Sequence, residues 1–135
     1  MQAPAQVAEL IPTAAERDAL FKAFARAFFK RDVDALYETV TPDFVWNTLD
    51  EKGAVSTVSG RESVAAQLAR RPASLDNLRF EDVRYHHAPE ASFMTFRLSA
   101  TDRRSGEPHV EVGVERYVFR DGRIAVKDVY RKAAR

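Results

Sequence analysis

Glu115 has the greatest potential for chemistry in this sequence, because it stands in the middle of a strand that is otherwise rich in apolar residues. Alternating apolar residues predict this strand over about 109–119, and a second one over about 123–131 follows the turn at Asp121-Gly122. A carboxylate held among apolar side chains can move a proton to or from a bound molecule. The residue that faces Glu115 across the hairpin therefore decides what this carboxylate can do.

The length of the turn sets the partner of Glu115. A two-residue turn would place Glu115 opposite Asp128, and like charges directly opposite one another destabilise a sheet. A three-residue loop, with Gly122 left-handed in a bulge, would place Glu115 opposite Lys127. Asp-Gly alone favours the shorter turn, but the charge pairing favours the longer loop. We therefore predict a Glu115–Lys127 ion pair, with Asp128 on the other face of the sheet.

Two kinds of role are open to Glu115 in this arrangement. An apolar pocket favours the protonated carboxyl, which could act on a carbonyl substrate while Lys127 or Tyr117 steadies an enolate. A nearby Lys127 favours the carboxylate instead, which suits a general base or a purely structural ion pair. The sequence leaves both roles open.

The elements that position these residues follow from the apolar spacing. Thr13 and Glu16 form a capping box at the start of an amphipathic helix, and Asp32 can cap a shorter one that Pro42 stops. The predicted helices run from residue 14 to about 31, from Val33 to about Val40, and from Ser59 or Gly60 as far as Pro72. The predicted strands cover residues 44–49, 54–58, 78–87, 92–101, 109–119 and 123–131. Helices followed by a long antiparallel sheet indicate an α+β domain with the helices on one face of a curved sheet.

Composition limits the partners that this domain can have. The 135 residues predict one domain over 13–135, preceded by an N-terminal extension over 1–12. A net charge of +1, from 21 basic and 20 acidic residues, gives no reason to expect nucleic acid or an anionic membrane as a partner. There is no cysteine, which excludes thiol catalysis and thiolate metal sites. Without a secretion signal or an apolar run of ~20 residues, a cytoplasmic location is expected.

One face of the strand over 109–119 carries valines, namely Val110, Val112, Val114 and Val118. The opposite face ends in Tyr117 and Phe119, so both faces require an apolar cover. The helices can cover one face, and a second copy of the chain can cover the other. We therefore predict a homodimer.

Four short motifs, in this order, resemble the nuclear transport factor 2-like superfamily. They are Gly60-Arg-Glu-Ser-Val-Ala-Ala66, Met94-Thr-Phe-Arg-Leu98, Ser105-Gly-Glu-Pro108 and Phe119-Arg-Asp-Gly-Arg-Ile124. The resemblance covers about residues 13–131, and the superfamily includes ketosteroid isomerases, SnoaL-like polyketide cyclases and limonene epoxide hydrolases. It implies a cone-shaped α+β domain with three helices on the concave face of a curved antiparallel sheet. It also implies dimers that form through the convex face.

The resemblance carries over only part of the isomerase site. The helix tyrosine of that site falls on Phe24 and its general-base aspartate falls on Thr48, and neither residue can do the same work. The second oxyanion donor falls on Glu115, which is also the nearest counterpart of the acid-base aspartate of SnoaL-like cyclases. The last-strand aspartate of the epoxide hydrolases falls on Val129. Ordinary ketosteroid isomerisation and epoxide hydrolysis are therefore not expected.

Side-chain alternation and the resemblance together predict an apolar pocket for a small molecule. We expect Glu115, Lys127 and Tyr117 to be its catalytic residues. Its substrate-binding wall is predicted to consist of Phe24, Trp46, Thr48, Gln67, Met94, Phe96 and Leu98. Asp50 is expected in a turn, and His86 and His87 at the surface. His109 and Glu111 share one face, but two ligands make a weak metal signal, so neither a metal nor a cofactor is expected.

The sequence thus favours a cofactor-independent acid-base enzyme, such as an isomerase, cyclase or dehydratase acting on a small apolar carbonyl compound. The alternative is a module of the same fold that binds a small molecule, or a second protein chain, without chemistry.

Overall fold

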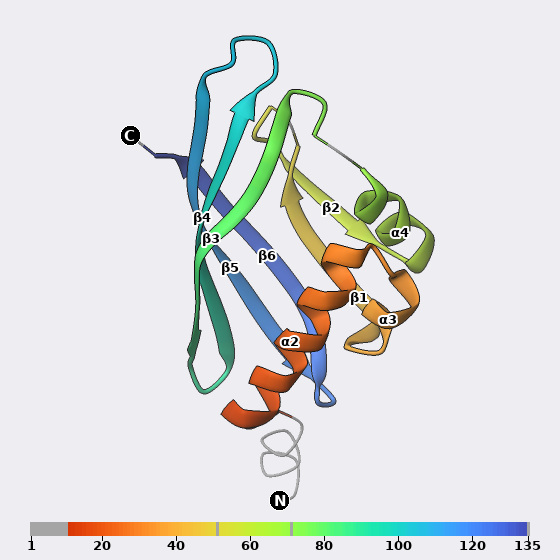
Figure 1. Ribbon diagram of the computed structural model, residues 1–135. Coiled ribbons are helices and arrows are strands. Elements are labelled where there is room, and N and C mark those ends of the chain that lie inside the picture. The colour runs from red at the N-terminus through yellow and green to blue at the C-terminus, as the bar shows by residue number, and fades with distance from the viewer. Residues whose placement is uncertain (1–10, 51, 71, 135) are drawn as a thin grey trace, which may run out of the picture.

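The structure is a computed structural model that describes residues 11–50, 52–70 and 72–134, so most of the predicted extension over 1–12 lies outside the described residues. Its helices are α2 (Ala14–Lys30), α3 (Val33–Tyr37) and α4 (Arg61–Ala69). Its strands are β1 (Val40–Leu49), β2 (Val55–Ser59), β3 (Leu75–His87), β4 (Ala91–Asp102), β5 (Pro108–Arg120) and β6 (Arg123–Ala133). Figure 1 shows α2 lying across the curved sheet, with α3 and α4 on the side of β1 and β2.

The six strands form one sheet in the order β2-β1-β6-β5-β4-β3. β1 runs parallel to β6, and every other neighbouring pair is antiparallel. The α+β class is confirmed, and the sheet is mostly rather than wholly antiparallel. This order places β5 and β6 in the middle of the sheet, so the residues of the hairpin lie under α2.

The capping box predicted for α2 is present, with Thr13 and Glu16 each accepting from the other's backbone N–H. The second helix is shorter than predicted. It is capped by Asp32 as expected, but it ends at Tyr37, and Val40 already pairs with Ile124 of β6. Pro42 therefore lies inside β1 rather than at a helix end, in an irregular stretch of the β1–β6 pairing where a missing N–H is tolerated.

The predicted three-residue loop of the β5–β6 hairpin is wrong. Asp121 and Gly122 form a two-residue turn with φ of 54° and 73°, and Arg120 pairs with Arg123. A bulge at Ala125 then shifts the register by one residue, so Glu115 faces Val129 and not Lys127. The bulge lets the neighbouring Ile124 and Ala125 both be buried.

The shifted register also removes the charge conflict that had favoured the longer loop. Arg116 now faces Asp128, an opposite charge, and Tyr117 faces Lys127. Asp128 lies on the other face from Glu115, as predicted, where it accepts a hydrogen bond from Asn47. The bulge thus separates the like charges, as the charge argument required, without a longer loop.

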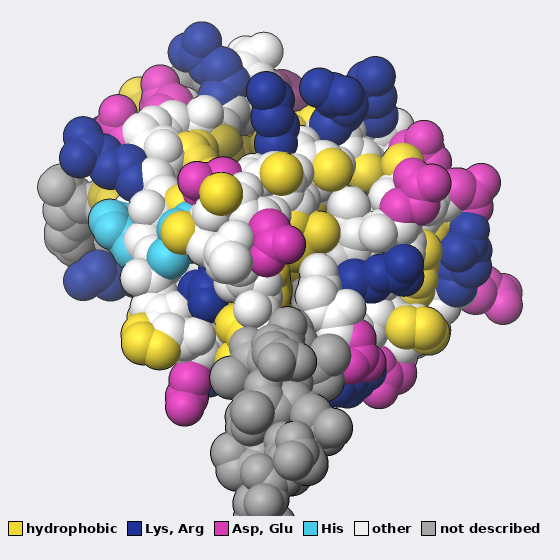
Figure 2. Space-filling model, turned by 90° about the horizontal axis from the view of Figure 1, so that it is seen from below, with side chains coloured by type: hydrophobic (Ala, Val, Ile, Leu, Met, Phe, Trp, Pro, Cys, Tyr) yellow, Lys and Arg dark blue, Asp and Glu magenta, His cyan; other side chains and the backbone are white. Residues whose placement is uncertain are grey.

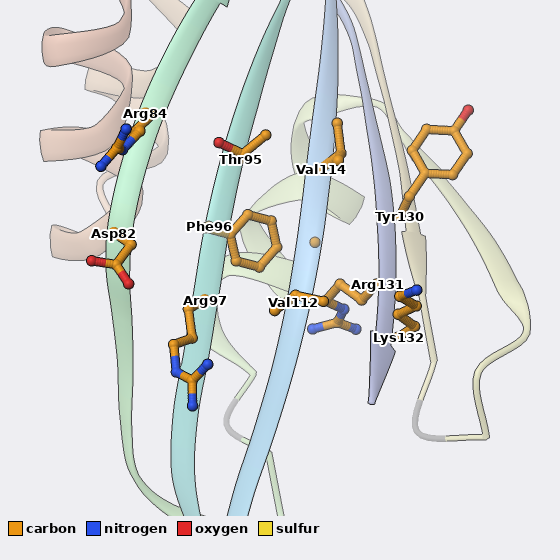
Figure 3. A pocket seen from close by; sticks show the side chains of 11 residues that line it. Asp82, Arg84, Thr95, Phe96, Arg97, Val112, Val114, Tyr130, Arg131 and Lys132 are labelled. Atoms are coloured by element: carbon orange, nitrogen blue, oxygen red, sulfur yellow. The ribbon is translucent and has the colours of Figure 1, made fainter. Parts of the chain in front are cut away.

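The core fills the space between α2 and the concave face of the sheet. Phe21 stacks on Tyr85 at 4.6 Å between ring centroids and meets the edge of Tyr117 at 4.8 Å. Farther along the sheet, Phe96 of β4 turns toward β5 (Figure 3). A Cβ on Gly113 would lie 2.4 Å from Cζ of Phe96, so only glycine leaves room for this ring on the strand.

Candidate functional site

Glu115, Tyr117 and Lys127 form a buried polar cluster at the centre of the sheet. Their residues are 5%, 2% and 3% exposed, respectively. The Tyr117 hydroxyl donates a hydrogen bond to Oε1 of Glu115, and Nζ of Lys127 lies 3.6 Å from the same oxygen. The predicted ion pair is therefore present, although it runs diagonally across the hairpin instead of between directly opposed residues.

Three aromatic rings lie around the amine of Lys127. Nζ lies 4.0 Å from the ring centroid of Phe28, 5.0 Å from that of Trp46 and 5.3 Å from that of Phe24. The two phenylalanines come from α2 and the tryptophan from β1, so the helix closes over a lysine that the sheet supplies. The faces of such rings attract a cation.

Burial shifts the pKa of Tyr117 and of Lys127. It raises the pKa of the Tyr117 hydroxyl well above its usual value, and the nearby charge of Glu115 adds to the effect. Burial likewise raises the pKa of Tyr85 to about 12. The pKa of Lys127 is lowered by burial, against the opposing effect of Glu115. The tyrosines are thus held as neutral donors, while the lysine can release a proton more readily than an exposed one.

A cavity of about 550 Å³ opens beside this cluster, and both Glu115 and Lys127 line it. The inner wall is buried and includes Trp46, Phe96 and Leu98. Toward the outside the lining becomes polar, with exposed residues such as Arg70 and Lys132. The size and the mixture of apolar wall and few convergent polar groups are usual for a small-molecule site.

The structure brings most of the predicted wall to this cavity. Five of the predicted wall residues line it, namely Trp46, Thr48, Gln67, Phe96 and Leu98. Phe24 and Met94 are buried outside its lining, as is Tyr117. Phe24 still contributes indirectly, because its ring packs against Tyr117 at 5.9 Å between centroids.

Sequence reasoning missed two contributors to the site. Phe28 is not among the predicted wall residues, yet of the three rings around Lys127 it lies closest to the amine. Arg131 lines the cavity and lies on the same face of β6 as Lys127, four residues farther along the strand. Its Nε lies 3.7 Å from Oε1 of Glu111. The alternation of β6 beyond Lys127 would have identified Arg131, had it been followed to the end of the strand.

The remaining polar candidates have local partners. Asp50 accepts from the backbone N–H groups of Lys52 and Ala54, which is the turn role predicted for it, although it also lines the cavity. His86 is exposed, whereas the side chain of His87 is 20% exposed and contacts Asp18 at 2.8 Å. Nε2 of His109 lies 2.5 Å from Oε2 of Glu111.

Surface charge is mixed in sign over the face in Figure 2, which carries both Lys or Arg and Asp or Glu side chains. Among residues 11–50, 52–70 and 72–134, no group of three or more side chains is arranged to hold a metal ion. Within the same part of the chain, no helix has the length and hydropathy needed to cross a lipid bilayer.

The sequence and the fold of the chain are both similar to those of known proteins. The sequence model of the SnoaL-like domain matches residues 21–127. No curated protein matches the chain. Among solved structures, an NTF2-like protein from Burkholderia xenovorans has a TM-score of 0.73 at 14% identity, covering 89% of this chain and 92% of its own.

Two further structures are named for chemistry or for a ligand. A candidate polyketide cyclase from Xanthomonas campestris has a TM-score of 0.64 at 21% identity, covering 86% of this chain and 90% of its own. TerC, co-crystallised with polyporic acid, has a TM-score of 0.67 at 20% identity, covering 85% of this chain and 90% of its own. At these identities the likeness establishes the NTF2-like fold and leaves the activity to the residues of the site.

Proposed function

The chain belongs to the SnoaL-like domain family, and we propose that it is a cofactor-independent acid-base enzyme acting on a small apolar carbonyl compound. The observation that carries this proposal is the buried Glu115–Lys127 pair, 3.6 Å apart, beside a cavity that both residues line. A buried charge pair is a poor source of stability, because desolvation offsets most of the attraction. A pair that faces a cavity is better placed to act on a ligand.

The geometry supplies the two groups that enolisation needs. The carboxylate of Glu115 takes a proton from the carbon beside the carbonyl group of the substrate, and the ammonium of Lys127 stabilises the negative oxygen that develops. Tyr117 holds Oε1 of Glu115, which leaves Oε2 to receive the proton. Return of the proton to another carbon gives an isomerase, attack of the enolate on a second carbonyl gives a cyclase, and loss of a β-hydroxyl gives a dehydratase.

Proton exchange tests this function without knowledge of the natural substrate. The full chain in D₂O should catalyse deuterium incorporation beside the carbonyl of an apolar ketone such as 2-tetralone, measured by NMR. Glu115→Gln should lower the rate about 100-fold, the lower end of what a positioned acid-base group contributes. Glu111→Gln, a cavity-lining change on the same strand, should retain the rate within about twofold.

Two outcomes would count against the enzymatic assignment. Exchange by Glu115→Gln at the wild-type rate would exclude this carboxylate as the base. Tight binding of apolar ketones with no exchange above the background would favour the second candidate, a small-molecule-binding module. What favours this second candidate is the residue types of Phe24 and Thr48, which by the resemblance stand where the isomerases carry catalytic groups and cannot do the same work.

A homodimer through the valine face is part of the same proposal. Val110, Val112, Val114 and Val118 are only half-buried in the single chain. Val112 and Val114 border a second cavity of about 720 Å³ on the sheet, beside Tyr130 and Arg97 (Figure 3). Sedimentation velocity at micromolar concentration should give a dimer, and Val112→Glu should give a monomer. A wild-type chain that sediments as a monomer would contradict the dimer.

A further inference from the structure

The amine of Lys127 is a nucleophile that lines the cavity, and the acid-base mechanism uses only its charge. It combines three features that imine-forming lysines share, namely an apolar setting, a carboxylate within reach and an adjoining cavity. Oε1 of Glu115 lies 3.6 Å from Nζ, and both residues line the cavity. The exposed lysines Lys22 and Lys30 on α2 have no such setting.

We propose that Lys127 forms an imine with the carbonyl group of an aldehyde or ketone bound in this cavity. The inference rests on the proposed function in taking the cavity as the site of a carbonyl compound. It adds a covalent activation step, in which the iminium draws electrons from the neighbouring carbon more strongly than the carbonyl does.

The protons of this step balance within the cluster. Glu115 takes one proton from the ammonium, and the free amine of Lys127 bonds to the carbonyl carbon. The nitrogen then gives a second proton to the carbonyl oxygen, which becomes the hydroxyl of a carbinolamine. The C–O bond then breaks, the hydroxyl leaves as water with the proton that Glu115 returns, and the nitrogen lone pair forms the C=N bond. One ammonium and one carbonyl thus give one iminium and one water, with no oxidant or reductant.

The surroundings of Nζ suit both the beginning and the end of this step. Burial lowers the pKa of Lys127, so the free amine is more available than on an exposed lysine. The iminium carries its positive charge at the same nitrogen as the ammonium. The rings of Phe28 and Trp46, at 4.0 and 5.0 Å from Nζ, and the carboxylate of Glu115 can therefore stabilise the product as they stabilise the starting cation.

Reductive trapping tests the inference. The full chain is incubated with benzaldehyde and sodium cyanoborohydride at pH 8, and peptide mass spectrometry follows benzyl addition to each lysine. Lys127 should be benzylated at least tenfold faster than Lys22 and Lys30. Benzyl alcohol, which has the same shape without the carbonyl, should slow the reaction at Lys127 and leave the exposed lysines unchanged.

Benzylation and ketone exchange together distinguish the imine from the acid-base function. Benzylation of Lys127 no faster than that of Lys22 and Lys30, or unaffected by benzyl alcohol, would overturn the imine. Ketone exchange that depends on Glu115, with no benzyl group on Lys127, would keep the proposed function and overturn the imine alone. Rapid, protectable benzylation of Lys127 in a chain without ketone exchange would support the imine and contradict the proposed acid-base function.

Discussion

Lys127→Met is expected to lower the free energy of unfolding by about 3–5 kcal/mol, because it leaves the charge of Glu115 buried without its partner. Methionine keeps the unbranched stem, so the packing against Phe28 and Trp46 changes little. The hydroxyl of Tyr117 remains as a hydrogen-bond donor to Glu115, but a neutral donor replaces only part of the lost attraction. Urea unfolding at pH 7, with an unchanged dependence on denaturant, measures the effect.

A double variant distinguishes the stability lost by leaving Glu115 unpaired from the stability lost with the packing of the Lys127 side chain. Lys127→Met combined with Glu115→Gln removes both charges, so it should recover most of the stability that Lys127→Met loses. If the double variant instead loses as much as the two single variants together, the cost comes from packing and not from an unpaired charge. A double variant that is stable but inactive would indicate that the pair is retained for chemistry.

Arg116→Met is the matched control on the same two strands. Arg116 lies 3.5 Å from Asp128 on the other face of the sheet, and its side chain is 44% exposed. Because Arg116 is exposed and Asp128 keeps its hydrogen bond from Asn47, loss of this pair should cost less than about 1 kcal/mol. A loss for Lys127→Met as small as this would contradict the prediction that burial makes Glu115 depend on its partner.

Much of the fold could be predicted because its signals are local. The capping box at Thr13 and Glu16 marks the start of α2, and the alternation of β4 and β5 gives the face on which Phe96 and Glu115 lie. The resemblance to the NTF2-like fold then placed these elements in one sheet. The start of β1 was not predicted, because it depends on parallel pairing with a strand more than 80 residues away.

The hairpin register could not be predicted, because a single-residue bulge has no signature of its own. Ala125 is an ordinary strand residue in the sequence, yet it decides which residues face Glu115. Charge pairing correctly excluded Glu115 opposite Asp128, and it also placed Asp128 on the other face. It could not distinguish a longer loop from a bulge farther along the strand, since both remove the same conflict.

The hydrogen-bond partners of Arg17 could not be predicted from the sequence either, because most of its acceptors come from a turn about 70 residues away. Arg17 lies on the same side of α2 as Phe21 and Phe24, and it is 5% exposed. Its guanidinium donates to the carbonyl oxygens of the β3–β4 turn, namely those of Ala88 at 2.6 Å, Pro89 at 3.0 Å and Ala91 at 3.2 Å. Its Nε donates to Pro12 O at 2.8 Å. One side chain thus joins the start of α2 to the end of the sheet.

Arg17→Met is therefore expected to destabilise the chain by about 3–5 kcal/mol, since a hydrogen bond to a charged donor contributes about 1.5–3 kcal/mol and some of the freed carbonyls regain water. Arg17→Lys should recover only part of this, because an ammonium cannot span acceptors on both sides as a guanidinium does. Arg26→Met, an exposed change on the same helix, should stay within about 0.5 kcal/mol of the wild type in urea unfolding.

The Arg17 contacts also bear on the site, because α2 carries the rings of Phe24 and Phe28 that enclose Lys127. A helix released from the β3–β4 turn should hold these rings less firmly and admit water to the amine. In folded Arg17→Lys protein, Lys127 should then be benzylated less selectively relative to Lys22. Unchanged selectivity together with a large loss of stability would mean that the rings are held by their packing on the sheet alone, independently of Arg17.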